Sequence, residues 1–151
     1  MPVFLLVFAA ATALFSQKNH HLNLLGSLAY PAQLSSLWGY EAPDGTPYAI
    51  VGEQNYVSIV SLADPSNPLE VAQVAGPNTF WREMKVWGHY AYVGLDNVST
   101  GLQIIDLQYL PDSIKSTSWK PNVLVGGGLT TVISAHTVTM DENGKIGRAH
   151  V

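Results

Sequence analysis

An internal repeat is the feature that most constrains this chain. Residues 48–52 (YAIVG) match residues 90–94 (YAYVG) at an offset of 42, and residues 57–62 (VSIVSL) match residues 102–107 (LQIIDL) at an offset of 45. The extra three residues lie in the loop between the matched segments, so both flanks stay in register, as a structural repeat requires. A period near 42 residues built from strand-like segments is typical of a β-propeller blade.

Each copy of the repeat divides into four short segments rich in β-branched and aromatic residues, which turn residues separate. The expected strands are 37–40, 48–52, 57–62 and 69–74 in the first copy, and 82–87, 90–94, 102–107 and 114–119 in the second. A third copy opens with a strand at 136–140, followed by the hairpin-turn sequence Asp141-Glu142-Asn143-Gly144.

The repeat predicts an all-β fold, a partial β-propeller with about two four-stranded blades plus the start of a third, preceded by a signal peptide. A parallel α/β fold is disfavoured because no amphipathic helical pattern lies between Ser35 and Lys120. A β-sandwich is a weaker rival, since its strands need not repeat at a fixed period. Two blades cannot close a ring, so we expect bare sheet faces and a tendency to aggregate.

The expected domain organisation follows the repeat. Residues 36–78 form the first blade, residues 79–121 the second, and residues 122–145 an inter-blade loop and the start of the third. Within the last segment, residues 123–131 contain three consecutive glycines and are expected to be a flexible excursion at the rim. Residues 17–35 form an N-terminal segment in which residues 24–28 are either a ring-closing strand or a local edge strand.

Both ends of the chain are expected to lie outside the fold. Residues 1–16 form a predicted signal peptide, because the apolar run 3–15 has the length of a signal-peptide core and is too short to span a membrane. A buried N-terminal helix is the alternative, since no Lys or Arg precedes the run. Residues 146–151 (IGRAHV) back-translate to a sequence that looks like a sequencing adapter, so we expect an adapter-derived tail there.

Composition excludes several function classes. A formal net charge of −4 offers no basic surface for phosphates, so nucleic acid is not expected as a partner. The absence of cysteine excludes disulfides, thiolate metal sites and a cysteine nucleophile. No nucleophile-elbow pattern and no clustered metal ligands occur, so we expect no cofactor and no metal, and a non-catalytic role is favoured.

Three polar residues are candidates for a ligand site. Ser36, Arg82 and His136 each start the first strand of their repeat, and the first strand of a blade lines the central channel. Convergent polar groups at a concave mouth predict a ligand-binding site. The structural alternative is that these residues satisfy backbone groups at strand starts, or that Arg82 pairs with an acid.

Other motifs have a structural and a functional interpretation. Asn97-Val98-Ser99 matches the glycosylation pattern in a loop expected to be exposed. The four tryptophans are either sugar-stacking platforms or blade-packing residues. Asp106 and the sequence 141–144 are better explained as turn-stabilising residues than as a catalytic acid or a calcium loop.

Several segments resemble a known family. Residues 102–106 (LQIID) resemble the LVIVD repeat, and residues 57–61 (VSIVS) look like a diverged copy in which Ser61 replaces the Asp. Together with residues 38–40, 64–68, 81–85 and 135–138, they are similar to bacterial choice-of-anchor B surface proteins over residues 24–145. That resemblance implies a secreted β-propeller anchored at the cell surface through C-terminal sequence that this chain lacks.

The expected function follows from the fold and the resemblance. It is a secreted or cell-surface propeller module, without a membrane span, that binds an extracellular protein or glycan without catalysis. The alternative is a fragment of an extracellular propeller enzyme, a hydrolase or lyase, with its active site at the central channel.

Overall fold

The computed structural model describes residues 22–147, and all the regular secondary structure in that range is β-strand. The predicted signal peptide and residues 148–151 of the predicted tail lie outside the described residues. The strands are β1 (Leu34–Glu41), β2 (Pro47–Glu53), β3 (Tyr56–Ser61), β4 (Leu69–Ala75), β5 (Arg82–Trp87), β6 (Tyr90–Leu95), β7 (Leu102–Asp106), β8 (Lys115–Trp119), β9 (Asn122–Val125) and β10 (Gly128–Thr131).

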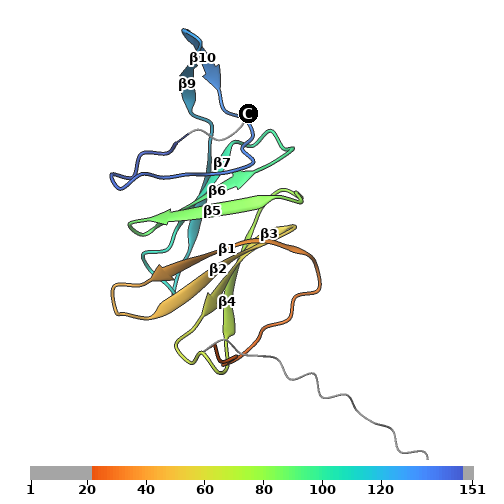
Figure 1. Cartoon of the computed structure of the whole chain (residues 1–151), viewed down its shortest axis with the longest axis vertical. Coiled ribbons are helices and arrows are strands. Elements are labelled where there is room, and N and C mark those ends of the chain that lie inside the picture. Colours follow the sequence, from red (N-terminus) through yellow and green to blue (C-terminus); the bar gives the residue numbers. More distant parts are fainter. Residues whose placement is uncertain (1–21, 148–151) are drawn as a thin grey trace, which may run out of the picture.

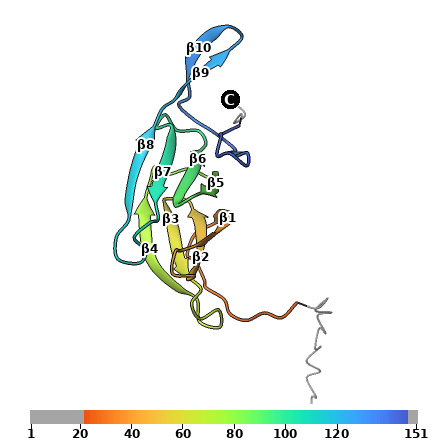
Figure 2. The ribbon, with the colours of Figure 1, turned by 90° about the vertical axis from the view of Figure 1, so that its left-hand side faces the viewer.

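Two four-stranded antiparallel sheets form the body of the molecule. The first has the order β1-β2-β3-β4 and the second the order β5-β6-β7-β8, so each repeat is one meander of neighbouring strands. Figures 1 and 2 show the sheets following one another along the long axis, with β1 and β5 side by side. The predicted fold class is confirmed for the described residues, which are all-β and whose two main sheets have the form of consecutive propeller blades.

The main hydrophobic core lies between the two sheets, because one face of each sheet is apolar. Ile50 and Ile59 on the first sheet and Met84, Val93 and Ile105 on the second are fully buried within a single cluster. Strand alternation places these residues on one face of their sheet. The repeat therefore produces a shared core between neighbouring sheets, which is how stacked repeat units bury their apolar faces.

Equivalent glycines allow the close approach at this junction. A Cβ at Gly52 would lie 2.5 Å from the carbonyl oxygen of Arg82, and a Cβ at Gly94 would lie 2.9 Å from the carbonyl oxygen of Ala135. The two glycines are 42 residues apart and end the matched segments of the repeat. The same contact thus joins each sheet to the segment that follows it.

Short acidic turns connect the strands. Asp64 Oδ1 accepts the backbone N–H of Ser66 at 3.0 Å, and Asp106 Oδ1 accepts that of Gln108 at 3.0 Å. Asp141 Oδ1 accepts the backbone N–H groups of Asn143 and Lys145 at 3.0 and 2.8 Å. The turn interpretation of Asp106 and of residues 141–144 is therefore confirmed.

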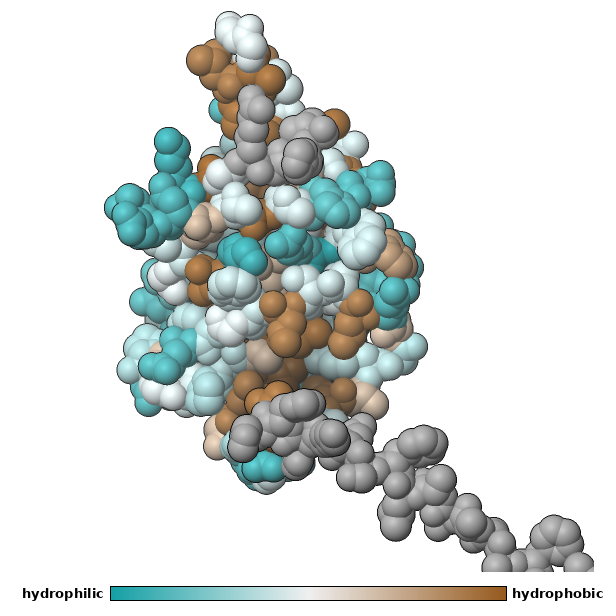
Figure 3. All heavy atoms as spheres, in the orientation of Figure 1, coloured by the Kyte–Doolittle hydropathy of each residue, from teal (hydrophilic) through white to brown (hydrophobic). Residues whose placement is uncertain are grey.

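The structure differs from the sequence prediction after the second sheet. Residues 123–131 do not form the expected flexible loop, because β9 and β10 pair as a hairpin that projects from the body. Gly126 and Gly127, with φ of 59° and 87°, supply the left-handed backbone of its two-residue turn. Leu124 and Leu129 face each other across the hairpin, and Figure 3 shows hydrophobic side chains at this projecting end.

The expected strand at 136–140 is reduced to a single bridge between Met140 and Ile146. It is short because no further strand pairs with this segment in the described chain, and an isolated two-stranded pairing is marginal. Residues 24–28 form no strand in this structure, and their part in closing a ring stays a prediction. The segment that contains them nevertheless contacts the first sheet, since the hydroxyls of Tyr30 and Ser58 lie 2.8 Å apart.

Candidate functional site

The candidate site lies at the end of the two sheets where β1 and β5 begin, which we call the mouth. Five stretches of backbone meet there: residues 34–36, 54–55, 76–81, 96–101 and 132–137. Backbone bonds hold them together, such as Thr79 N–H to Gln54 O at 3.0 Å and Gly101 N–H to Ile133 O at 2.8 Å. The mouth is therefore built by loops of both sheets and by the segment that follows them.

Arg82 is fully buried beneath the mouth. Its guanidinium donates to four acceptors: Glu53 O at 2.8 Å, Gln54 O at 3.2 Å, Pro77 O at 2.6 Å and Gln103 Oε1 at 3.5 Å. Burial lowers the pKa of Arg82 while the Glu53 carboxylate raises it, and an arginine remains charged at neutral pH. This geometry supports the structural alternative for Arg82, and its role in ligand binding stays a prediction.

Gln103 extends this buried network to the first sheet. Its side-chain Nε2 donates to Ala75 O at 2.9 Å, although Gln103 lies on β7 of the second sheet. The chain passes so close that a Cβ at Gly76 would lie 2.6 Å from Nη1 of Arg82. Gln103 could not be identified as a site residue from the sequence, because the repeat motif at residues 102–106 indicates a β-strand and nothing about the contacts of its side chains.

Ser36 is partly buried and pairs with Gly52 across β1 and β2. The contact between the sheets is made instead by its neighbour Ser35, whose Oγ accepts the backbone N–H of Arg82 at 3.1 Å. The same hydroxyl lies 3.3 Å from both Gly52 O and Arg82 O, to either of which it can donate. Sequence reasoning missed Ser35 because a β-bulge between Leu34 and Ser36 breaks the strict alternation that it assumed.

His136 lies at the mouth but on the solvent side. Its Nδ1 is 2.9 Å from Oδ2 of Asp96, and its ring centroid is 5.3 Å from that of Trp81. Trp81 also packs edge-to-face against Phe80 at 4.8 Å. The exposed side of the mouth thus combines two aromatic rings with a His–Asp pair, and sequence reasoning did not foresee Phe80 or Asp96.

The structure does not bring the three predicted residues into one constellation. Arg82 and the backbone beside Ser36 form the buried part of the mouth, whereas His136 belongs to the exposed part with Asp96 and Trp81. Among residues 22–147, no hydrogen bond joins His136 to Arg82 or to Ser36. The role of the trio as a ligand site stays a prediction, and the exposed part is the surface that a ligand can reach.

Asn97 lies on the exposed loop between β6 and β7, next to the mouth. It has a φ of 58°, a left-handed conformation that asparagine tolerates better than most residues. Its backbone N–H is held by Asp96 Oδ1 at 2.8 Å. The side chain is exposed, as the predicted glycosylation pattern requires, and glycosylation of Asn97 stays a prediction.

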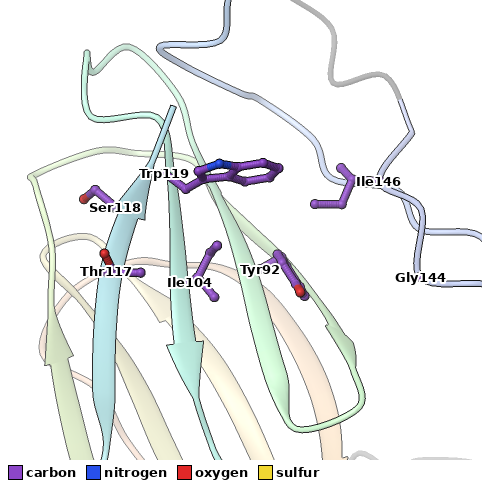
Figure 4. Close-up of a pocket in the computed structure, with 7 residues that line it drawn as sticks. All are labelled: Tyr92, Ile104, Thr117, Ser118, Trp119, Gly144 and Ile146. Atoms are coloured by element: carbon purple, nitrogen blue, oxygen red, sulfur yellow. The ribbon is translucent and has the colours of Figure 1, made fainter. Parts of the chain in front are cut away.

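A separate hollow of about 420 Å³ lies on the far face of the second sheet. Figure 4 shows its lining: Tyr92, Ile104, Thr117, Ser118, Trp119, Gly144 and Ile146. Tyr92 and Ile104 are the repeat equivalents of Ile50 and Ile59, which are buried between the two sheets. The hollow therefore occupies the position of a second inter-sheet core. Among the described residues, the segment 135–147 lies opposite the sheet, and its buried Ala135 and Val138 form a small apolar cluster with Leu102 beside the hollow.

Within residues 22–147, no three His, Asp or Glu side chains lie close enough together to hold a metal ion. The same part of the chain contains no helix long and apolar enough to cross a membrane.

Comparison with known families agrees with the two-sheet architecture. Residues 47–75 and 82–114 match the LVIVD repeat. The first LVIVD repeat covers β2 to β4, and the second covers β5 to β7. The predicted resemblance to LVIVD repeats is confirmed for these two segments. No curated protein and no solved structure matches the chain.

Proposed function

We propose that this LVIVD-repeat chain is a secreted or cell-surface binding module and that its mouth binds an extracellular partner without catalysis. The observation that supports the proposal best is the exposed half of the mouth. Phe80 and Trp81 remain 51% and 43% exposed beside the His136–Asp96 pair. Exposed aromatic groups next to convergent polar groups are typical of binding surfaces.

Buried contacts beneath the mouth fix the backbone that carries the exposed residues, which supports a binding role. Arg82 and Ser35 hold the first and second sheets together below the surface, so the backbone that presents Trp81 is fixed on both sides. Thr79 Oγ1 donates to Asp96 O at 2.6 Å, which ties the 76–81 link to the β6–β7 loop. Preorganised side chains lose little conformational entropy when a ligand binds.

The enzyme alternative has less support in the geometry. A His–Asp pair is the base and orienting acid of a nucleophilic triad, but a triad also needs a hydroxyl or thiol within reach of the histidine. Among residues 22–147, no hydrogen bond joins His136 to a serine or threonine hydroxyl. A hydrolase or lyase with its centre at the channel would need residues from further blades.

Secretion, surface anchoring and relationship to choice-of-anchor B proteins are parts of the same proposal. The apolar run at 3–15 and the polar residues after Ser16 support export. The two LVIVD repeats support the family resemblance.

Two measurements test the proposal. The full chain, expressed with its own N-terminus in a secreting bacterial host, is recovered outside the cytoplasm and sequenced from its N-terminus; we expect the mature protein to begin at Gln17. Fluorescently labelled protein is then applied to cells, with Trp81→Ala and Trp87→Ala as matched variants, because Trp87 is 47% exposed at the other end of β5. Loss of cell binding in Trp81→Ala alone supports the proposal, and equal binding by both variants contradicts it.

A further inference from the structure

The exposed part of the mouth presents two aromatic side chains to solvent, Phe80 and Trp81. Phe80 and Trp81 are in edge-to-face contact with their ring centroids 4.8 Å apart, and the ring centroids of Trp81 and His136 are 5.3 Å apart. Large aromatic rings are normally buried, so two of them held in contact with solvent are suited to a ligand that has an apolar face. The indole of Trp81 provides the larger platform.

Hydrogen-bonding groups border this platform. The His136 Nδ1 is engaged by Asp96 Oδ2 at 2.9 Å, which leaves Nε2 of His136 as the ring nitrogen available to a ligand. The other Asp96 oxygen, Oδ1, accepts the Asn97 backbone N–H at 2.8 Å. Both carboxylate oxygens therefore have partners, and Nε2 of His136 is the group of this pair that can hydrogen-bond a ligand hydroxyl.

The platform and the polar pair are held in a fixed relation. The Asp96 backbone N–H donates to Trp81 O at 3.3 Å. The Thr79 hydroxyl lies 2.6 Å from Asp96 O, to which it donates, and 3.2 Å from Trp81 O. Thr79 itself is buried. A site of this kind keeps its geometry in the free protein, which favours the binding of a small rigid ring.

We propose that Phe80, Trp81, Asp96 and His136 form a subsite for a neutral pyranose unit of a β-linked saccharide. This inference rests on the proposed binding function and specifies its ligand class. In a β-linked glucose- or xylose-type ring every substituent, including the glycosidic oxygen, is equatorial, so both faces present only C–H groups that can stack on an aromatic face while the hydroxyls point outward toward bordering donors and acceptors. In an α-linked ring the glycosidic oxygen is axial and interrupts one of these faces. A basic peptide would instead require a carboxylate with a free oxygen, whereas both oxygens of Asp96 already have hydrogen-bond partners within the chain, Asn97 N–H and His136 Nδ1.

The test is a titration of the full chain with xylohexaose and with cellohexaose, and with maltohexaose as the α-linked comparison. Binding is measured by isothermal titration calorimetry and by tryptophan fluorescence. We expect saturable binding of at least one β-linked hexamer and little binding of maltohexaose. Trp81→Ala is expected to weaken binding at least about tenfold, in line with the loss of a central aromatic contact. Trp81→Phe retains a stacking ring and is expected to restore part of the affinity.

Two further variants separate the subsite from general effects. His136→Gln removes the imidazole and is expected to weaken β-saccharide binding, while Trp87→Ala at the far end of β5 is expected to leave it unchanged. Near-ultraviolet circular dichroism of each variant confirms that the fold persists. Absence of saturable binding to every β-linked hexamer, or equal affinity in wild type and Trp81→Ala, overturns the inference.

The proposed function is tested separately by treating the cells with periodate or with protease before binding. Loss of cell binding after periodate, which oxidises vicinal diols, supports a saccharide ligand. Loss after protease alone, with cell binding still dependent on Trp81, shows that the mouth binds a protein, so that the proposed function stands and the saccharide inference fails.

Discussion

Gly52 lies directly against the backbone of Arg82, although the two residues belong to different sheets. A Cβ at Gly52 would come within 2.5 Å of the Arg82 carbonyl oxygen and 2.9 Å of Ser35 Oγ. The carbonyl is part of β5 and cannot move without disturbing the strand. The distance between neighbouring sheets is therefore set by the absence of a side chain at this position of the repeat.

Substitution of Gly52 by alanine is expected to destabilise the protein by about 2 kcal/mol, because the added methyl group overpacks a rigid contact. Chemical denaturation followed by fluorescence measures the change. Gly39→Ala is the matched control, since Gly39 is also a strand glycine but a Cβ there has no atom within 4 Å. Equal destabilisation by both substitutions would show that the sheets do not approach each other at Gly52.

Replacement of Arg82 by leucine is expected to cost about 3 kcal/mol or more. The substitution leaves the buried carbonyl group of Glu53 and the partly buried carbonyl group of Pro77 without the guanidinium donor, and a buried unsatisfied group costs about 1–3 kcal/mol. The comparison is Lys85→Met, because Lys85 is partly exposed and contacts the Trp38 ring and Glu83 at the surface. That substitution is expected to cost less than about 1 kcal/mol. A reversed order of the two effects in urea unfolding would contradict the buried network.

Substitutions at the adjacent Ser35 and Ser36 test which of the two side chains the β-bulge in β1 directs toward Arg82. Ser35→Ala is expected to cost about 1 kcal/mol, since Ser35 Oγ joins β1 to the backbone of Arg82. Ser36→Ala is expected to change the free energy of unfolding by less than about 0.5 kcal/mol, as for most substitutions away from such contacts. A larger effect at Ser36 than at Ser35 would place the bulge elsewhere.

Buried tyrosines predict a loss of stability at high pH. Burial is the largest cause that raises the pKa of Tyr40 and of Tyr48 above the ordinary value of 10.0. A group whose pKa is higher in the folded state binds its proton more tightly there, so its contribution is complete below pH 10.0 and is lost as the pH rises through the folded-state pKa. Unfolding curves at pH 8 and above about pH 10 measure this effect, and absorbance at 295 nm reports tyrosinate formation.

The matched variant for the alkaline effect is Tyr48→Phe, which keeps the ring and removes the titrating hydroxyl. We expect it to flatten the fall in stability at high pH. If Tyr48→Phe shows the same alkaline slope as the wild type, the destabilisation does not come from this tyrosine.

Much of the fold is predictable from the sequence because strand period and turn chemistry are local. All eight strands of the two sheets were expected within a few residues of their observed bounds, and Asp106 was identified as a turn residue from its position at a strand end. The hairpin at 122–131 was not foreseen, because consecutive glycines indicate either a flexible loop or a two-residue turn, and only the pairing of β9 with β10 decides between them.

The site was less predictable, since it depends on contacts between distant segments. Strand alternation predicts equivalent positions for Ser36, Arg82 and His136. In the structure, a β-bulge in β1 gives the contact with Arg82 to Ser35 instead of Ser36. The Arg82 guanidinium is buried, whereas His136 is exposed. Asp96 and Phe80 carried no signal in the sequence. Both residues lie at the mouth because Thr79 joins the 76–81 link, which contains Phe80, to the β6–β7 loop, which contains Asp96.

The central claim is that the two repeats fold as consecutive sheets packed face to face, and methionine methyl labelling tests it directly. The chain has three methionines, and the fully buried Met84 has its ε-carbon 3.0 Å from a Cβ built at Gly52 of the first sheet. We predict nuclear Overhauser effects from the Met84 methyl group to the α-protons of Gly52. A Met84 methyl group that shows contacts only to protons of residues 82–119 would contradict the account.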